Sequence, residues 1–344
     1  MRISGNRLTM ICVLAAAGTG SLAIAQKGYI PFGTVGEITR PDIGELWQQP
    51  AGISTEDLLY GAGGREHVPH GPFTFEKEDL EGTNPKFDVK DSDGVRWKIK
   101  LGAEAKPETV ASRFVWAMGY HVDQDYWLPQ VQVMGLPEHV HRGGDMIERG
   151  GIMRDVRLKR QTGEKKVGGW NWKDNKFVGT RELDGLRVMM AVIDNWDLKN
   201  ENNAVRDIKL PGGGTRREFL VSDLGASFGT TGRTLSHEGS KGNVDAYKKA
   251  KFITDVKPDT VSFAVPSHPE LLLAFDTPEF VERMDMRWIG RDIPRDHVRW
   301  IAGLLGQLTD VQIRDAFHSA GYLGPDADGF TFTIEHRIAE LKKL

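Results

Sequence analysis

The sequence predicts an α+β fold in which strands dominate the first half and helices the second. Between residues 60 and 140, short segments of alternating apolar residues are separated by turns rich in glycine, aspartate and proline, as is typical of strands. The last hundred residues instead show helical spacing with start and stop signals. Such segregation is typical of α+β proteins. We therefore expect a small antiparallel sheet with one helix over 60–140 and a larger, mainly helical part over 141–344.

Composition is compatible with one two-lobed enzyme. The chain has 344 residues, of which 39% are hydrophobic, and it contains nine tryptophans, so it can bury a substantial core. The formal net charge is −3. Because binding to a phosphate backbone requires a basic surface, this balance argues against nucleic acid as the main partner.

The first 25 residues have the pattern of a secretory signal peptide. Arg2 and Arg7 precede an apolar segment over 8–14, and small residues lead to Ala25, after which we expect cleavage. The only cysteine, Cys12, lies inside this segment, so the mature chain would contain no thiol. We expect an exported protein, periplasmic or secreted, with no membrane span in the mature chain; a retained amino-terminal anchor is the alternative.

Several strands and one helix are expected after an irregular leader over 26–59. Residues 72–77 and 86–90 are predicted strands, and Asp91-Ser92-Asp93-Gly94 is a hairpin turn into a third strand ending near Leu101. Alternation along that third strand places Lys98 and Lys100 on one face. A further strand is predicted over 126–133.

The predicted helix between these strands begins near Pro107 and ends near Gly119, so Glu108 lies in its first turn. Upstream, Gly61 and Gly63 belong to a glycine-rich run that is a candidate phosphate-covering loop, although no flanking strand pattern identifies it.

The second half contains an acidic, asparagine-rich loop after a predicted buried helix over 182–193. Its central residues are Asp197, Lys199 and Asn202. Strands over 204–210 and 218–221 are expected to form a hairpin that leads to Asp223-Leu224-Gly225. Alone, such a loop is usually a capped turn. The order of helix, loop, hairpin and aspartate favours a functional site.

This ordered set resembles the protein-kinase-like superfamily over roughly residues 60–260, closer to its atypical and bacterial branches. Asp197-Leu198-Lys199 with Asn202 matches the spacing of the catalytic loop, and Asp223-Leu224-Gly225 stands in the place of Asp-Phe-Gly. Three departures place it away from eukaryotic protein kinases: Asn195-Trp196 replaces His-Arg, Leu224 replaces Phe, and no Ala-Pro-Glu follows.

The resemblance implies a two-lobed kinase-like fold that binds ATP and Mg²⁺ or Mn²⁺. Lys100, or else Lys98, would hold the nucleotide phosphates, and Glu108, with Glu104 as the reserve, would fix that lysine. Asn202 and Asp223 would bind the metal. Asp197 would orient the acceptor hydroxyl, and Lys199 would neutralise the transferring phosphoryl group.

The function expected is therefore an exported ATP- and magnesium-dependent phosphotransferase with an unknown hydroxyl-bearing acceptor, either a protein or a small molecule. One alternative is a catalytically silent kinase-fold binding protein. Another is nucleotidyl transfer on the same fold, because motifs that bind metal and phosphates do not distinguish the two reactions.

Other features predict less chemistry. His139 and His141, with Asp145 nearby, form a weak metal pattern that is better interpreted as a surface pair. The basic run over 154–166 is typical of a solvated loop, although it would also suit an anionic substrate. Three helices are expected over 278–289, 294–305 and 309–320. Thr309 begins the last of them with a capping box.

Overall fold

A computed structural model describes residues 42–210, 212–230, 240–265, 281, 284 and 286–344. The predicted signal peptide, residues 26–41 of the predicted leader and half of the predicted helix over 278–289 lie outside these residues. No helix in the described ranges is long and apolar enough to cross a membrane.

The first part of the fold is a six-stranded sheet. Its strands are β1 (Phe73–Asp79), β2 (Lys86–Lys90), β3 (Arg96–Lys100), β4 (Asp125–Met134), β5 (Ile147–Glu148) and β6 (Ile152–Arg160). Their order is β3-β2-β1-β4-β6-β5, and β3 also pairs with β6, so five of the strands form a closed ring. All pairings are antiparallel except the short one between β1 and β4.

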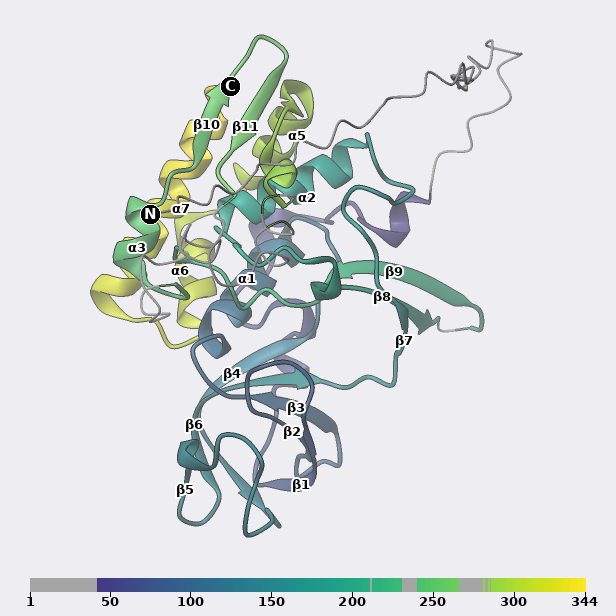
Figure 1. Cartoon of the computed structure of the whole chain (residues 1–344), viewed down its shortest axis with the longest axis vertical. Helices are drawn as coiled ribbons and strands as arrows, with labels where there is room; N and C mark the ends of the chain where they lie inside the picture. The colour runs from purple at the N-terminus through teal and green to yellow at the C-terminus, as the bar shows by residue number, and fades with distance from the viewer. Residues whose placement is uncertain (1–41, 211, 231–239, 266–280, 282–283, 285) are drawn as a thin grey trace, which may run out of the picture. The chain divides into compact units, whose positions relative to one another are not determined.

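Helix α1 (Ala105–Ala117) connects β3 to β4 and is almost entirely buried. Figure 1 shows it next to the end of this sheet and close to the helices of the second part. One face of the sheet has its own apolar core, which includes Phe87, Trp97 and Leu158. Helix α1 instead contributes Val110 and Phe114 to the larger core. The helix thus belongs to the helical core while its amino-terminal end remains beside the sheet.

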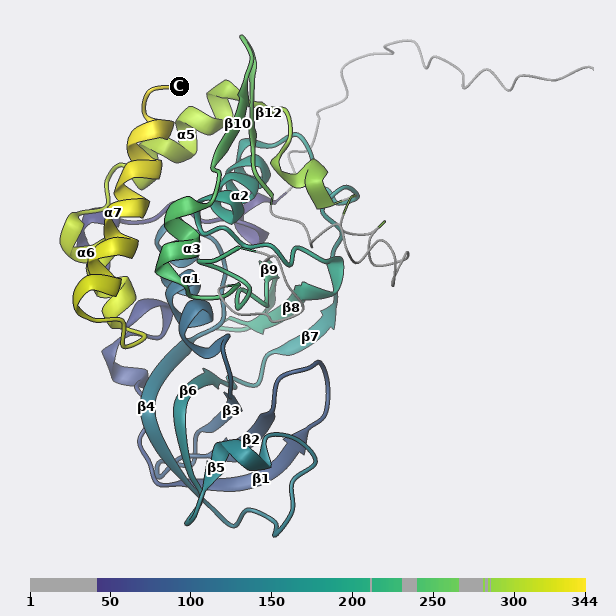
Figure 2. The same cartoon turned by 60° about the vertical axis from the view of Figure 1, so that its left-hand side comes forward.

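The second part combines helices with two small sheets. Its helices are α2 (Arg181–Val192), α3 (Val244–Lys249), α5 (Arg295–Leu305), α6 (Asp310–His318) and α7 (Gly324–Leu341). One sheet contains β7 (Lys165–Gly168), β8 (Asn203–Lys209) and β9 (Thr215–Val221); the other contains β10 (Ile253–Val256), β11 (Thr260–Phe263) and β12 (Ile293–Pro294). Figure 2 shows α6 and α7 lying side by side.

Aromatic packing holds α1 and the segment after β9 against these helices. Phe228 contacts Phe114 and Phe317, with ring centroids 6.2 and 5.3 Å apart. Phe317 of α6 and Phe330 of α7 stack with centroids 4.8 Å apart and planes inclined by 7°. Such pairs each contribute about 0.5–1.5 kcal/mol beyond area burial. This cluster fixes the position of the chain just after Asp223.

The sequence predicted the α+β class and most of the elements. The hairpin of β8 and β9, the capping box at Thr309 and helix α5 are present. The strands β5, β6, β7, β10, β11 and β12 and the helices α3 and α7 were missed. The basic run expected to be a solvated loop contains β6, which pairs with both β3 and β4. The sheet therefore extends beyond residue 140, where the small lobe was expected to end. Helix α7 was not predicted at all.

Candidate active site

Lys100 lies in the interior because β3 alternates apolar and basic residues. Trp97 and Ile99 face the sheet core, and both are buried. Lys98 and Lys100 face the other way. The Lys100 side chain is only 3% exposed. The chain then turns at Gly102, whose φ of 98° favours glycine, and enters α1. This tight turn brings the first turns of α1 within reach of Lys100.

Three carboxylates surround the Lys100 ammonium. Its Nζ lies 2.5 Å from Glu104, 2.9 Å from Glu108 and 3.3 Å from Asp223. Burial alone would lower the pKa of Lys100, but these three carboxylates outweigh it and raise the pKa above its ordinary value. Lys100 therefore stays protonated. Of the two candidate lysines, Lys100 is the one that contacts Glu108, and it contacts the reserve Glu104 as well.

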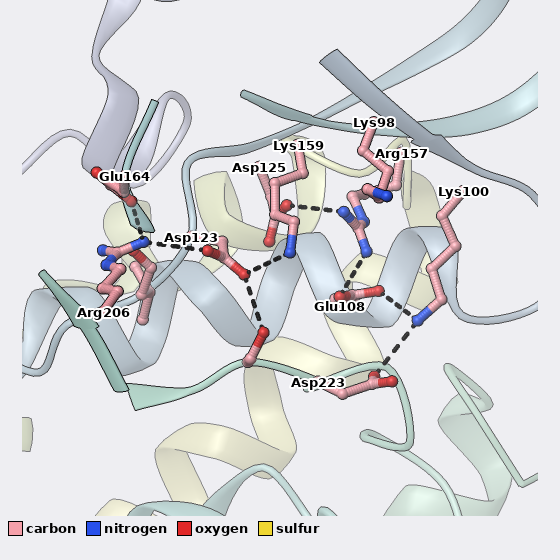
Figure 3. Close-up of polar contacts among 12 residues, drawn as sticks. Lys98, Lys100, Glu108, Asp123, Asp125, Arg157, Lys159, Glu164, Arg206 and Asp223 are labelled. Atoms are coloured by element: carbon pink, nitrogen blue, oxygen red, sulfur yellow. Dashed lines mark hydrogen bonds and ion pairs between the residues drawn. The ribbon is translucent and has the colours of Figure 1, made fainter. Parts of the chain in front are cut away.

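A second buried cation supports Glu108 from the sheet. Arg157 of β6 lies directly opposite Lys100 and donates from Nη2 to Glu108 at 2.7 Å. Its Nη1 is 3.3 Å from Asp125. Glu108 thus lies between two cations (Figure 3). Burial raises the pKa of Asp125 to about 7, although Arg157 opposes that rise.

Asp223 reaches the site from the end of the β8–β9 hairpin. The backbone amides of Ser222 and Asp223 donate to the carbonyl of Asn202, at 2.7 and 3.3 Å. One carboxylate oxygen, Oδ1, accepts from the Gly225 amide at 3.1 Å and contacts Lys100. Burial would raise the pKa of Asp223, but Lys100 and the Gly225 amide lower it to about 2. The Asp223 side chain remains 42% exposed.

The acidic loop after α2 is held by its own asparagines. Asn202 donates from Nδ2 to the Asp197 carbonyl at 2.7 Å, and the Asp197 amide donates to Asn195 at 3.0 Å. Asp197 and Asn202 are both half-buried. Asn202 therefore joins Asp197 on one side to Asp223 on the other. A metal site shared by their side-chain oxygens stays a prediction.

The remaining predicted residues lie apart from the Lys100 cluster. Lys98 pairs with Asp79 and with Asp88 rather than with a glutamate of α1. Lys199 precedes the short helix Asn200–Asn202 and lines a small cavity together with Trp172. Their predicted roles stay predictions.

Gly61 and Gly63 form a short helix that packs on neighbouring elements. A Cβ atom on Gly61 would lie 2.4 Å from the Arg113 side chain, and one on Gly63 would lie 2.0 Å from the Tyr126 hydroxyl. These glycines allow the short helix Gly61–Gly63 to pack closely on α1 and β4. Close packing explains why they are glycines, and the phosphate-covering role stays a prediction.

The donor set fits a hard divalent cation. Carboxylate oxygens of Glu104, Glu108 and Asp223 lie within 4.8 Å of one another, but Lys100 occupies their centre. Two further candidate ligand atoms are the second carboxylate oxygen of Asp223 and the Oδ1 of Asn202. Neither atom accepts a hydrogen bond from any residue that the structure describes. Carboxylate and amide oxygens are ligands that Mg²⁺ accepts.

The histidines proposed as a weak alternative metal site form no such group. His141 Nδ1 lies 3.0 Å from Glu78, and the side chain of His141 is 76% exposed. His139 and Asp145 are exposed too. Within the described ranges, these residues do not belong to the group of carboxylates that could hold an ion.

The sequence did not predict a set of paired charged side chains that continues from Arg157 along β6. Lys159 Nζ lies 3.0 Å from Asp123, and Arg206 Nη1 lies 3.2 Å from the same aspartate. Burial alone would raise the pKa of Asp123, but Lys159 and Arg206 lower it. The alternation of Val156 and Leu158 with basic residues was a signal for a strand. It was obscured by the density of charge.

Comparisons with known proteins add little. No protein-family model and no curated protein sequence matches the chain. Among solved structures, a Helicobacter pylori proinflammatory kinase, CtkA, is similar with a TM-score of 0.40 and 10% identity, covering 78% of this chain and 95% of that one. A similarity this loose carries no weight for the activity, which has to be argued from the site.

Proposed function

We propose that this protein is a metal-assisted phosphotransferase with a protein-kinase-like arrangement of its site. The observation that carries the proposal is the meeting of Lys100, Glu108 and Asp223, three residues from separate elements. An ammonium fixed by a buried carboxylate, beside a second carboxylate that stays partly exposed, is suited to holding phosphates and a metal ion together.

Each residue has a distinct task in this mechanism. Lys100, held by Glu108, binds the phosphates of the donor and is kept protonated by its three carboxylates. Asp223 and Asn202 would hold Mg²⁺ or Mn²⁺. When bound, such an ion neutralises charge that develops on the transferring phosphoryl group.

Asp197 would orient the attacking hydroxyl and accept its proton. The backbone of Asp197 is fixed by Asn195 and Asn202, so little reorganisation is needed when the acceptor arrives. ATP is the first donor to test. The acceptor remains any hydroxyl-bearing protein or small molecule, and export, with cleavage near Ala25, is part of the proposal.

The first experiment is a thermal shift with ATP, GTP and ADP, each with Mg²⁺ or Mn²⁺. A ligand that binds only the folded state raises the melting temperature by mass action; at a hundredfold excess over Kd the stabilisation is about 2.7 kcal/mol. We expect a shift that requires both nucleotide and metal. The absence of any shift at millimolar ATP, GTP or ADP would contradict a nucleotide as the donor.

A further inference from the structure

A strongly basic cavity lies next to Asp223. It has a volume of about 230 Å³ and is bounded by β3, by the connection from β6 to β7 and by the β8–β9 hairpin. Ala204 and Leu220 are its apolar lining residues, and Ser222 connects it to Asp223. Two carboxylates line it, Asp123 and Glu164, against five cations: Lys98, Lys159, Arg160, Lys166 and Arg206.

The backbone register places like charges directly opposite one another around this cavity. Lys98 is paired with Lys159, and Lys166 is paired with Arg206. Closer to Asp223, Lys100 is opposite Lys86 on one side and Arg157 on the other. Like charges at directly opposed strand positions destabilise a sheet. Such a pattern needs anions to offset the repulsion.

Carboxylates offset three of the five lining cations. Lys98 pairs with Asp79 and Asp88, and Lys159 pairs with Asp123. Arg206 pairs with Asp123, Glu164 and Glu218; Figure 3 shows the pairs of Lys159 and Arg206 with Asp123. Arg160 donates to the neutral side chain of Gln124 at 3.3 Å. Among the residues that the structure describes, neither Lys86 nor Lys166 forms an ion pair or a hydrogen bond through its ammonium. Burial and the nearby Lys100 lower the pKa of Lys86, although Asp79 and Asp223 oppose this.

This lining fits a different ligand from a nucleotide base. Pockets for flat heterocycles are lined mainly by apolar and aromatic side chains. Here the residues of this kind are Ala204 and Leu220. Lysine and arginine side chains instead form strong charge-assisted hydrogen bonds with phosphate oxygens. The cavity is therefore better suited to phosphate groups than to a nucleotide base.

We propose that this cavity holds the distal phosphates of a linear inorganic polyphosphate, which is the phosphoryl donor. The inference rests on the proposed function and specifies its donor. The terminal phosphate would lie at Lys100 and Asp223, and the rest of the chain would extend towards Arg160 and Lys166. ATP and linear polyphosphate both contain a chain of three phosphates. With polyphosphate the cavity would hold further phosphates, whereas with ATP it would have to hold the nucleoside.

The reaction balances without any further reactant. A bond forms between the acceptor oxygen and the terminal phosphorus, and the adjacent P–O–P anhydride bond breaks. The acceptor hydroxyl proton passes to Asp197. The products are a phosphate monoester and a polyphosphate that is one unit shorter.

The test is a thermal-shift titration of the protein with tripolyphosphate, ATP or adenosine, in each case with Mg²⁺ at constant ionic strength. We expect the half-maximal shift at a concentration about tenfold lower for tripolyphosphate than for ATP, and no shift with adenosine. Lys166→Gln, alone and combined with Arg160→Gln, should weaken tripolyphosphate binding about tenfold. Lys165→Gln is the matched control, because Lys165 faces Asp207 and does not line the cavity.

Several results would overturn the donor assignment while leaving the proposed function intact. They are tighter binding of ATP than of tripolyphosphate, a shift with adenosine alone, or equal tripolyphosphate affinity in the Lys166→Gln and Lys165→Gln variants. If neither donor shifts the melting temperature, both the donor assignment and the proposed function fail.

Discussion

Lys100 and Asp194 are equally buried but are treated in opposite ways by their surroundings. Lys100 is 2% exposed and Asp194 is 1% exposed. Lys100 contacts three carboxylates. The carboxyl oxygens of Asp194 have no hydrogen-bond partner among the described residues, and its backbone has a φ of 54°, unusual for a residue other than glycine.

The comparison of Lys100 with Asp194 shows which buried groups remain ionised in this fold. The cluster at Lys100 stays ionised because each charge has an opposite charge next to it. Burial instead raises the pKa of Asp194 to about 7, although Arg337 opposes the rise. Lys100 and Asp223 therefore keep their charge, whereas Asp194, which lacks a hydrogen-bond partner among the described residues, is neutral below about pH 7. The ionised cluster is the one suited to binding phosphate and metal.

The largest expected effect is the removal of Glu108. Glu108→Ala leaves Arg157 and Lys100 without their shared carboxylate, and breaking a buried ion pair from one side costs about 3–5 kcal/mol. Glu148→Ala is the matched control, because Glu148 also pairs with an arginine, Arg154, but both side chains are at least half exposed. Its substitution should have little effect on stability, because solvent screens the exposed pair. Urea unfolding at pH 7 measures both; equal losses would show that the Lys100 cluster is not a buried network.

The next effect concerns Asp194 and depends on pH. The pKa of Asp194 is raised from its ordinary value of 3.8 to about 7 in the folded protein. The free energy of unfolding is therefore highest below pH 3.8, and it falls as the pH rises from 3.8 to about 7. The difference between these two pKa values corresponds to a loss on the order of 4 kcal/mol in the free energy of unfolding above neutral pH. Asp194→Asn should therefore stabilise the protein at pH 8 and change little at pH 4, since asparagine tolerates positive φ.

The measurement is the free energy of unfolding of both proteins between pH 4 and pH 8. Asp296→Asn is the control, because the Asp296 side chain is 79% exposed and its substitution should have no comparable effect. A difference between Asp194→Asn and the parent that does not change with pH would contradict a neutral carboxyl in the native state.

A smaller effect is expected for Asp223. Its folded pKa is lowered, so it stabilises the protein above its ordinary value of 3.8, and this contribution disappears as pH falls through about 2. Because the side chain is 42% exposed, solvent screening limits the contribution at pH 7 to about 1 kcal/mol. Asp223→Ala should cost about that amount in thermal unfolding. A loss as large as that of Glu108→Ala would indicate a structural rather than a metal-binding role.

Local patterns predicted the elements that carry this site. The alternation of Trp97 and Ile99 with lysines indicated β3, and Pro107 indicated the start of α1. Their sequence proximity made contact between Lys100 and Glu108 predictable. The hairpin between Asn202 and Asp223 was predictable from the turn and the flanking strands. These are short-range features, set by side-chain period and turn chemistry.

Long-range pairing was beyond such patterns. Arg157 joins the site because β6 pairs with β3 from more than fifty positions away, and charge density disguised that strand as a loop. Gly61 and Gly63 looked like a phosphate loop because glycine composition does not reveal what a glycine packs against. Tertiary contacts decide which ionisable side chains have a partner of opposite charge, and these contacts cannot be inferred from local sequence patterns.

The most direct test of the site compares Asp223→Ala with Asp197→Ala, measuring ligand binding and phosphoryl transfer in the same preparations. Asp223 contacts Lys100 and is assigned to metal and phosphate binding, whereas Asp197 is assigned to the acceptor. With Mg²⁺ and either ATP or tripolyphosphate, Asp223→Ala should abolish the ligand-dependent thermal shift. Asp197→Ala should keep most of the shift and lose transfer or slow donor hydrolysis. If both variants bind the donor and turn it over like the parent protein, the assignment of this site is wrong.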